Sequence, residues 1–353
     1  MTVVPESRAD DHEMRDQTNN DEPWRCGVGS SDFAGLHCVV TGGLGFIGSN
    51  LALRLARERA QVIVIDAGYP RHGANPHNLD GGEGIRVVRC DLGDRAVRAA
   101  VEGAEFVFNL AGQVSHVDSM SEPLFDLEVN THSQLAFLGV LREVAPAATV
   151  VFTSTRQLFG RPRYLPVDEE HPVEPVDVNG ISKYAAERFH LLYDDCYGLA
   201  VKILRLTNVY GPRQRLRDDF QGFLPIFIRR ALLDETISVF GDGTQVRDCL
   251  YVDDVVACLL NAALFGPHGE VFNIGNDENL SVRDLALAIV AAAGRGRVEF
   301  GPWPIDRDAI DIGSYFGDSS KAKRLLNWTA DTVFADGIER TIAFYRAHLD
   351  HYI

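Results

Sequence analysis

The chain has 353 residues, 46% of them hydrophobic and 24% charged, which is the composition of a globular protein long enough for two domain-sized units. Its formal net charge of −16 argues against nucleic acid and anionic membranes as partners, because an acidic surface repels both. The sequence has no apolar run long enough to span a bilayer, and its first residues lack the basic start and apolar core of a secretion signal. We therefore expect a cytoplasmic protein.

The first 35 residues differ in composition from the rest of the chain. They contain eight acids against three bases, a net charge of −5, and show little apolar periodicity. This pattern predicts a flexible acidic tail over residues 1–35.

The six cysteines form no CxxC pair, and most of them lie inside apolar runs such as HCVV and VVACLL. We expect them to be small core residues in a reducing cytosol, with neither a disulfide framework nor a metal site.

Between residues 36 and 212, short apolar runs alternate with longer helical periods. The runs predict strands at 36–41, 61–66, 84–90, 105–112, 149–155 and 201–206. The segments between them predict helices at 46–59, 94–101, 121–144 and 179–197. Strands separated by helices pair in parallel and are covered on both faces, so we expect an α/β fold with a Rossmann-type doubly wound parallel sheet over 36–212.

After residue 212 the alternation of strands and helices becomes less regular, and Gly and Pro interrupt shorter elements. Helices are expected at 222–233, 252–264, 281–294 and 319–326, and strands in ISVFG and EVFNIG. We expect residues 213–353 to form mainly a smaller C-terminal substrate-binding lobe, from which later segments return to the first sheet. Ligands of such sheets bind beyond the carboxyl ends of the strands.

A glycine-rich loop directly follows the first expected strand and opens into a helix. Gly42, Gly45 and Gly48 allow a tight turn and a close approach of the backbone to a pyrophosphate, while Phe46 and Ile47 begin the helix. The loop in this context predicts a dinucleotide-binding site.

A carboxylate stands at the end of the second expected strand. Asp66 lies 24 residues after Gly42, where it can accept hydrogen bonds from both hydroxyls of an adenine ribose. Because it would repel a 2′-phosphate, the sequence predicts NAD rather than NADP as the cofactor.

Further motifs follow in order along the chain: NLAGQ, FTSTRQLFG, SKYAAE, RLTNVYGP and GDGTQVRDCLYVDD. Together with TGGLGFIG they resemble the extended short-chain dehydrogenase/reductase superfamily, specifically its NAD-dependent sugar-nucleotide epimerases and dehydratases. The resemblance covers about residues 36–347. It implies a nucleotide-sugar or nucleotide substrate and a homodimer formed through the two longest helices.

The resemblance also implies roles for individual residues. On the cofactor side it implicates Asp91 and Leu92 at the adenine, Leu110, Ala111 and Gln113 along the cofactor toward the nicotinamide, and Lys183 at the nicotinamide ribose.

On the substrate side the resemblance assigns Thr155 to the oxygen that is oxidised. It assigns the nucleotide diphosphate to Asn208 and Arg247, and arginine suits this role through its forked donors. The residues His116, Ser119 and Gln157 are expected to face the substrate. Two plainer explanations stay open: a solitary histidine is more often a satisfied polar residue than a base, and Arg247 beside Asp248 can be a surface ion pair.

One position departs from the family pattern. Relatives carry a Tyr-xxx-Lys pair, whereas Asn179 stands four residues before Lys183 in this chain. The two side chains share a helix face and should project into the site together. An amide has no useful proton affinity near neutral pH, so Asn179 cannot replace a tyrosine as base. Tyr184 lies about 140° around the helix from position 179 and should face elsewhere.

Three hypotheses accommodate this departure. In the first, which we favour, the protein is an active enzyme whose base is another group or a water ordered by Thr155, Asn179 and Lys183. In the second, it binds NAD without turnover, as a sensor or scaffold. In the third, an irregular start of the helix lets Tyr184 enter the site.

The residues after Thr155 indicate the reaction. Dehydratases of the family carry an Asp-Glu pair at this point, and here Arg156 and Gln157 occupy it, so 4,6-dehydration lacks its acid and base. Epimerisation needs only transient oxidation of a carbinol and return of hydride to the opposite face, most simply at C4. The stretch LAGQVSHVDS also resembles CDP-tyvelose 2-epimerase, so inversion at C2 remains an alternative, as does inversion of a furanose hydroxyl on the nucleotide itself.

Overall fold

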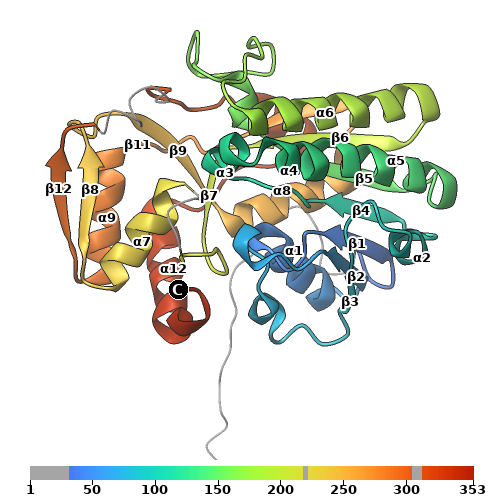
Figure 1. Ribbon diagram of the computed structural model, residues 1–353, viewed down its shortest axis with the longest axis horizontal. Coiled ribbons are helices and arrows are strands. Elements are labelled where there is room, and N and C mark those ends of the chain that lie inside the picture. Colours follow the sequence, from blue (N-terminus) through green and yellow to red (C-terminus); the bar gives the residue numbers. More distant parts are fainter. Residues whose placement is uncertain (1–31, 218–221, 304–311) are drawn as a thin grey trace, which may run out of the picture.

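The structure, a computed structural model, describes residues 32–217, 222–303 and 312–353. Its central feature is a seven-stranded parallel sheet with the order β3-β2-β1-β4-β5-β6-β10 (Figure 1). The strands are β1 His37–Thr41, β2 Gln61–Asp66, β3 Arg86–Arg89, β4 Phe106–Asn109, β5 Thr149–Thr155, β6 Ala200–Leu206 and β10 Glu270–Ile274. The expected Rossmann-type doubly wound sheet is confirmed.

Helices cover the sheet on both faces, which explains why its strands are almost continuously apolar. One core packs beneath α1 Phe46–Arg57, α8 Val252–Phe265 and α11 Ser320–Leu326. The other packs beneath α2 Ala96–Val101, α5 Ser133–Val144 and α6 Val178–Tyr197. Because α8, β10 and α11 belong to the sheet layer, the chain returns to it after residue 212.

A second group of elements lies beside the sheet and has its own apolar core (Figure 1). Its three-stranded sheet contains β7 Asn208–Tyr210, β9 Val246–Tyr251 and β11 Asn279–Ser281, and its two-stranded sheet contains β8 Thr236–Phe240 and β12 Arg297–Gly301. Its helices are α7 Phe223–Leu232, α9 Val282–Ala293 and α12 Phe334–His348. The apolar-run analysis did not predict β7, β9, β11, β12 or α12.

The single helix expected over 121–144 is wrong. The chain forms α3 His116–Ser121, α4 Pro123–Leu127, a π-helical turn η3 Glu128–His132 and then α5. Pro123 has no N–H to continue α3 and instead begins α4. The remaining short turns are 3₁₀ helices: η1 Pro70–His72, η2 Pro76–Leu79, η4 Arg156–Phe159 and η5 Leu349–His351.

The acidic tail expected over 1–35 extends too far. Phe33 is fully buried, and its ring packs edge-on against Phe106 with the ring centroids 5.1 Å apart. Burial of so large an aromatic group holds this segment against the sheet. The rest of the predicted tail, residues 1–31, lies outside the described part of the chain.

The cysteines are mostly core residues. Cys38, Cys90, Cys249 and Cys258 are buried, whereas Cys196 on α6 is exposed. Cys26 lies outside the described residues. Among the helices of the described ranges, none is both long and apolar enough to cross a membrane.

Candidate active site

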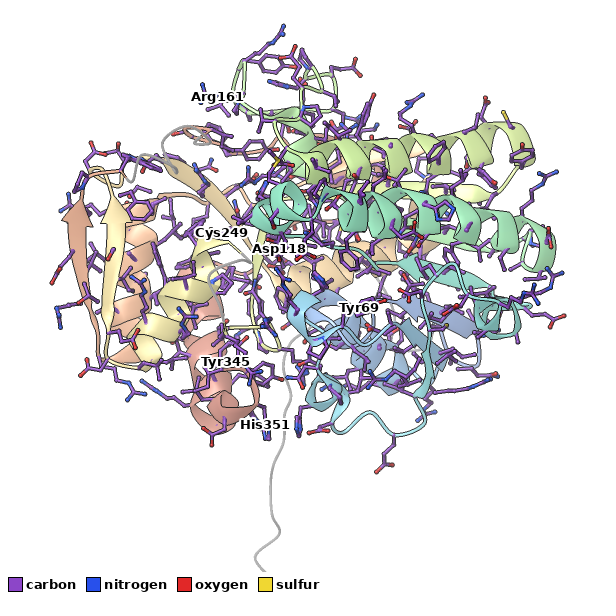
Figure 2. All side chains as sticks on the ribbon, in the orientation of Figure 1. Tyr69, Asp118, Arg161, Cys249, Tyr345 and His351 are labelled. Atoms are coloured by element: carbon purple, nitrogen blue, oxygen red, sulfur yellow. The ribbon has the colours of Figure 1, made fainter. Side chains whose placement is uncertain are left out.

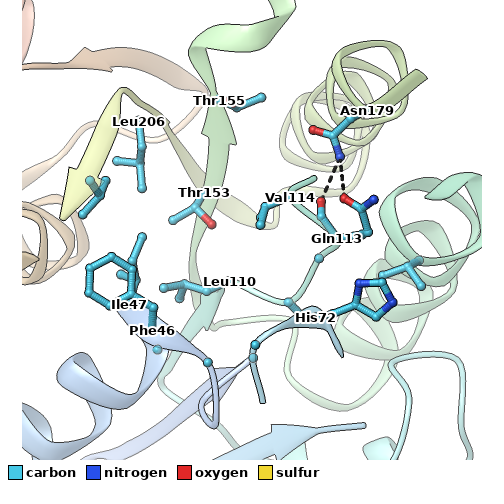
Figure 3. A pocket seen from close by; sticks show the side chains of 18 of the residues that line it. Phe46, Ile47, His72, Leu110, Gln113, Val114, Thr153, Thr155, Asn179 and Leu206 are labelled. Carbon is cyan, nitrogen blue, oxygen red and sulfur yellow. Dashed lines mark hydrogen bonds between the residues drawn. The ribbon is translucent and has the colours of Figure 1, made fainter. Parts of the chain in front are cut away.

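A cavity of about 500 Å³ opens at the carboxyl ends of β1, β2, β4, β5 and β6 (Figure 3), and residues at the start of α7 also line it. The glycine loop and the predicted substrate residues line the same cavity. All the predicted site residues take part in this lining except Ser119. The fold thus collects residues from separate segments of the chain at the edge where doubly wound sheets bind ligands.

Ser119 is the exception. It is fully buried in α3, and its hydroxyl donates to the carbonyl oxygen of His116 at 2.8 Å. The hydroxyl is therefore used inside its own helix. The structure does not bring Ser119, expected to face the substrate, to the cavity lining.

The glycine loop brings β1 and α1 close together. Gly42 has a left-handed φ of +68°, and a Cβ atom on Gly48 would lie 2.3 Å from the carbonyl oxygen of Gly42. Only glycine permits this contact. The first turn of α1 then presents free backbone N–H groups and no acidic side chain, which suits a pyrophosphate.

Asp66 ends β2 beside this loop. One carboxylate oxygen accepts from the N–H of Leu44 at 3.0 Å and the other from the N–H of Gly68 at 2.7 Å. Burial raises the pKa of Asp66, and these two hydrogen bonds oppose the shift. The residues around the loop therefore fit a dinucleotide with an unmodified adenine ribose.

Asn179 and Lys183 lie one helical turn apart on α6, and both line the cavity, as their spacing predicted. Burial lowers the pKa of Lys183 to about 8, and the negative charge of Asp126 opposes part of this shift. Tyr184 instead packs with the small apolar cluster around Phe159 and Tyr315 and does not line the cavity. The regular start of α6 at Val178 removes the irregular helix on which the third hypothesis depended.

The amide of Asn179 is held by a buried polar network. Its nitrogen donates to the carbonyl oxygen of Gln113 and to Asp126, each at 2.9 Å, and Figure 3 shows it directed toward Gln113. Asn130 donates to the same two groups, each at 3.0 Å. Because a carboxylate oxygen accepts hydrogen bonds, the amide nitrogen of Asn179 faces Asp126, and the amide oxygen of Asn179 faces away from it.

Sequence reasoning missed Asp126 and Asn130. Both are fully buried, on α4 and on the π-helical turn respectively. Pro123 was the available signal, because a proline inside an expected helix marks a break at which side chains change direction.

His116 is not a solitary polar residue. Its Nδ1 forms a very short contact with a carboxylate oxygen of Asp177, and its Nε2 meets the side-chain amide of Gln157. The other oxygen of Asp177 caps α6 by accepting from the N–H of Gly180 at 2.7 Å. Burial raises the pKa of Asp177, but the hydrogen bond to His116 and other favourable contacts outweigh it and hold this pKa below its usual range. Asp177 is a further residue that the sequence did not point to.

Thr155 ends β5 and points into the cavity (Figure 3). Its hydroxyl oxygen accepts from the N–H of Gln157 at 3.2 Å and so begins the turn η4. The hydroxyl hydrogen remains available to a ligand oxygen. Thr155 therefore both ends the strand and faces the site.

The other end of the cavity carries Asn208 and Arg247. One guanidinium nitrogen of Arg247 donates to the carbonyl oxygens of Val246 and Gly313, the first at 2.9 Å. Asp248, its neighbour on β9, is fully buried and accepts from the N–H of Gly317 at 3.0 Å. Successive side chains of a strand point to opposite faces, and Asp248 is buried. Arg247 and Asp248 therefore do not have the geometry of a surface ion pair.

Comparison with known proteins agrees with this geometry. Residues 38–275 match the NAD dependent epimerase/dehydratase family. The chain is 32% identical over 307 residues to a putative UDP-glucose 4-epimerase of Methanocaldococcus jannaschii, covering 86% of this chain and 96% of that protein. It is 31% identical over 320 residues to dTDP-glucose 4,6-dehydratase of Streptomyces griseus, covering 88% of this chain and 94% of that protein.

Among solved structures, UDP-glucose 4-epimerase of Thermotoga maritima with UDP-glucose superposes with a TM-score of 0.80 at 31% identity. The match covers 88% of this chain and 99% of that one. The sequence match, the shared fold and the glycine-loop cavity agree, and the chain belongs to the NAD-dependent epimerase/dehydratase family.

Proposed function

We propose that the protein is an NAD-dependent nucleotide-sugar epimerase that oxidises one carbinol carbon transiently, most simply C4, and returns hydride to its opposite face. The observation that carries the proposal is a single cavity that joins a dinucleotide loop to Thr155 and Lys183 but has Arg156 and Gln157 where an elimination would need carboxyl groups. Inversion at C4 is chosen over C2 or a nucleotide furanose because the similar epimerases are named for C4.

The cofactor half of the cavity is assigned to NAD, which supplies a hydride acceptor that is regenerated in each turnover. The pyrophosphate is assigned to the loop and the first turn of α1, and the adenine ribose to Asp66. The remaining contacts are assigned to Asp91 and Leu92 at the adenine and to Leu110, Ala111, Gln113 and Lys183 toward the nicotinamide.

The substrate half is assigned by the chemistry of its donors. Thr155 donates its hydroxyl to the oxygen that is oxidised, and Asn208 and Arg247 bind the diphosphate. His116 and Gln157 face the sugar. Asn179 contributes its fixed amide oxygen as an acceptor, not as a base.

Arg156 makes dehydration the weaker alternative. Its guanidinium lies 4.9 Å from the ring centre of Tyr315 and donates to the side-chain oxygen of Asn208 at 3.4 Å. A permanently charged guanidinium held in this way neither gives nor takes a proton at neutral pH. Elimination of water needs an acid and a base at adjacent carbons, and this wall of the cavity offers a cation and a neutral amide instead.

The proposal is tested by incubating the purified protein with a panel of nucleotide sugars and nucleoside phosphates in deuterated water, followed by NMR. We expect a C4 epimer without deuterium at carbon, because hydride returns from a bound carrier. Solvent deuterium at carbon would instead indicate enolisation and would overturn the hydride mechanism. Failure of every panel member alongside tight NAD binding would favour a silent NAD-binding sensor or scaffold.

A further inference from the structure

Oxidation of an alcohol requires a group that accepts the hydroxyl proton while hydride leaves the carbon. The position that carries the tyrosine base in relatives holds Asn179, and its amide nitrogen already donates to Gln113 and Asp126. An amide whose nitrogen donates two hydrogen bonds in this way offers no basic lone pair to a hydroxyl proton. The proton acceptor of this cavity must therefore be sought among its other titratable side chains.

Most of those side chains can be set aside. Burial lowers the pKa of Lys183 only to about 8, so at neutral pH it is mainly an ammonium without a lone pair. Asp126 is buried behind the cavity and does not line it. Tyr69 donates to Asp91 at 3.0 Å, at the adenine end.

Two histidines also line the cavity. The ring of His72 stacks on Phe125 with centroids 4.9 Å apart, and no carboxylate hydrogen-bonds to it within the described residues. His116 differs because the carboxylate of Asp177 contacts its Nδ1. A carboxylate acceptor fixes the ring proton on Nδ1 and leaves the lone pair of Nε2 as the basic site.

We infer that His116, oriented by Asp177, is the proton acceptor that replaces the missing tyrosine. The inference rests on the proposed function. As the carbinol is oxidised, its O–H bond would break and the proton would pass to Nε2 of His116, while a bound NAD would supply the acceptor for the hydride that leaves the carbon with both electrons. When hydride returns to the opposite face, the imidazolium gives the proton back to the oxygen, so neither proton nor electrons are gained or lost.

Asp177 is placed to act as a positioning residue. One of its oxygens is fixed by the N–H of Gly180 at the start of α6, so the oxygen that faces His116 has little freedom. The side chain of Asp177 is only 9% exposed, whereas that of His116 is 43% exposed and lines the cavity. The carboxylate is thus withdrawn from the cavity while the imidazole lines it, which is the arrangement of a base held by a third group.

The side-chain amide of Gln157 can form a hydrogen bond with both the neutral and the protonated imidazole of His116. Its amide nitrogen contacts Nε2 of the neutral imidazole, and its Oε1 is buried without a hydrogen-bond partner in the described part of the chain. Rotation of the amide by half a turn would present Oε1 to the N–H of an imidazolium. The backbone N–H of the same residue donates to Thr155 at 3.2 Å, so Gln157 connects the imidazole to the proposed oxygen-binding hydroxyl.

The first test needs no substrate. In protein with ¹⁵N-labelled histidine rings, NMR should show neutral His116 protonated on Nδ1, with the signal assigned by its loss in His116→Gln. Asp177→Ser keeps an oxygen that can cap α6 but is too short to reach the imidazole, so the Nδ1–H population should fall. A wild-type His116 protonated on Nε2 would overturn the inference.

The second test separates binding from chemistry. In His116→Gln, kcat should fall about 10²- to 10⁴-fold with little change in KM, and in Asp177→Ser it should fall at least about tenfold. His268→Gln removes an exposed histidine that pairs with Asp194 at 3.1 Å far from the cavity, and it should retain the wild-type rate. Wild-type kcat in a folded His116→Gln protein would disprove the inference and leave the epimerase proposal intact, whereas absence of wild-type turnover would defeat the epimerase proposal itself.

A pH profile gives a readout that a structural role would not change. The dependence of kcat on pH in the acid range should differ between the wild type and His116→Gln, because the variant has no imidazole beside Asp177. Two charged groups on neighbouring elements bear on the imidazole. Asp177 contacts it, and the positive charge of Arg156 acts on Asp177. If kcat of His116→Gln has the same dependence on pH as the wild type, another group causes that dependence, and the result counts against the inference.

Discussion

At the scale of single residues, the site shows how one substitution is accommodated by its neighbours. Asn179 occupies the tyrosine position, and Asp126 accepts its amide N–H at 2.9 Å. The same carboxylate lies close enough to the Lys183 ammonium to oppose the fall in its pKa that burial causes. Asp126 therefore holds the orientation of the amide and favours the charged form of the lysine.

This coupling predicts the effect of Asp126→Asn. Without the negative charge, the pKa of Lys183 should fall below about 8, because the attraction that favours the ammonium is lost. If the ammonium donates to the nicotinamide ribose, NAD affinity declines as pH rises through this pKa. The decline should therefore begin at lower pH in Asp126→Asn, as measured by fluorescence titration of NAD at a series of pH values.

The control for this prediction is Glu128→Gln. Glu128 is an exposed carboxylate on the adjacent π-helical turn, paired with His132 at 2.8 Å. Its neutralisation should leave the pH dependence of NAD binding unchanged. Identical profiles for wild type and Asp126→Asn would mean that Asp126 does not control the charge of Lys183.

The pKa of Lys183 also has a consequence for stability in the absence of cofactor. Its folded-state pKa of about 8 lies below the ordinary value of 10.5, so between these pH values the unfolded chain binds more protons than the folded one. The contribution of this group to the free energy of unfolding therefore increases as pH rises from about 8 to 10.5. Urea unfolding should show this rise in the wild type and not in Lys183→Met, and equal slopes in both would contradict the buried-ammonium assignment.

At the scale of elements, two breaks in regular structure build the site. The tight turn at Gly42 lets α1 begin against β1, and the π-helical turn after α4 directs Asn130 inward to Gln113. Uninterrupted helix over 121–144 would carry its side chains through a regular 100° rotation per residue. Widening of one turn changes this rotation and brings residues from α4 and η3 to the same buried network.

The glycine loop provides the prediction at this scale. Gly48→Ala places a Cβ 2.3 Å from a backbone oxygen, so the loop and helix must separate. We expect NAD affinity to fall at least about tenfold and the free energy of unfolding to decrease, as measured by calorimetric titration and urea unfolding. Gly139→Ala in α5, where the added Cβ would lie 3.9 Å from the Tyr193 hydroxyl, should bind NAD normally. Normal NAD binding by Gly48→Ala would contradict the assignment of this loop to the pyrophosphate.

At the scale of the whole molecule, large apolar side chains are exposed on the face formed by α3, α4 and α6. Leu124 is 80% exposed, Met120 62% and Ile181 57%. The elements that carry them are in contact with one another and lie along one side of the molecule (Figure 1). Figure 2 draws the side chains on these helices, with Asp118 of α3 labelled. A patch of this kind suits association with a second copy, and we propose a homodimer.

The dimer proposal predicts the behaviour of Leu124→Glu combined with Ile181→Arg. Charged groups at these positions should oppose burial, so sedimentation should give a dimer for the wild type and a monomer for the double variant. Leu287→Glu on α9, where the wild-type side chain is 45% exposed, serves as the control and should remain dimeric. A monomeric wild type would end the proposal.

The sequence alone determined the features that depend on neighbours along the chain. Strand and helix periodicity predicted the doubly wound sheet, and spacing predicted that Asn179 and Lys183 face the same cavity while Tyr184 does not. These are consequences of helical and strand repeat, which local residues specify.

Only the tertiary structure decided which distant residues surround those positions. Asp126 meets Asn179 across 53 residues, and His116 meets Asp177 across 61. The tertiary fold also turned Ser119 away from the cavity and buried Phe33, which the sequence had placed in a tail. Such contacts have no periodic signal, because they depend on where separate helices and strands come together, and in this protein they supply the carboxylates that position the site.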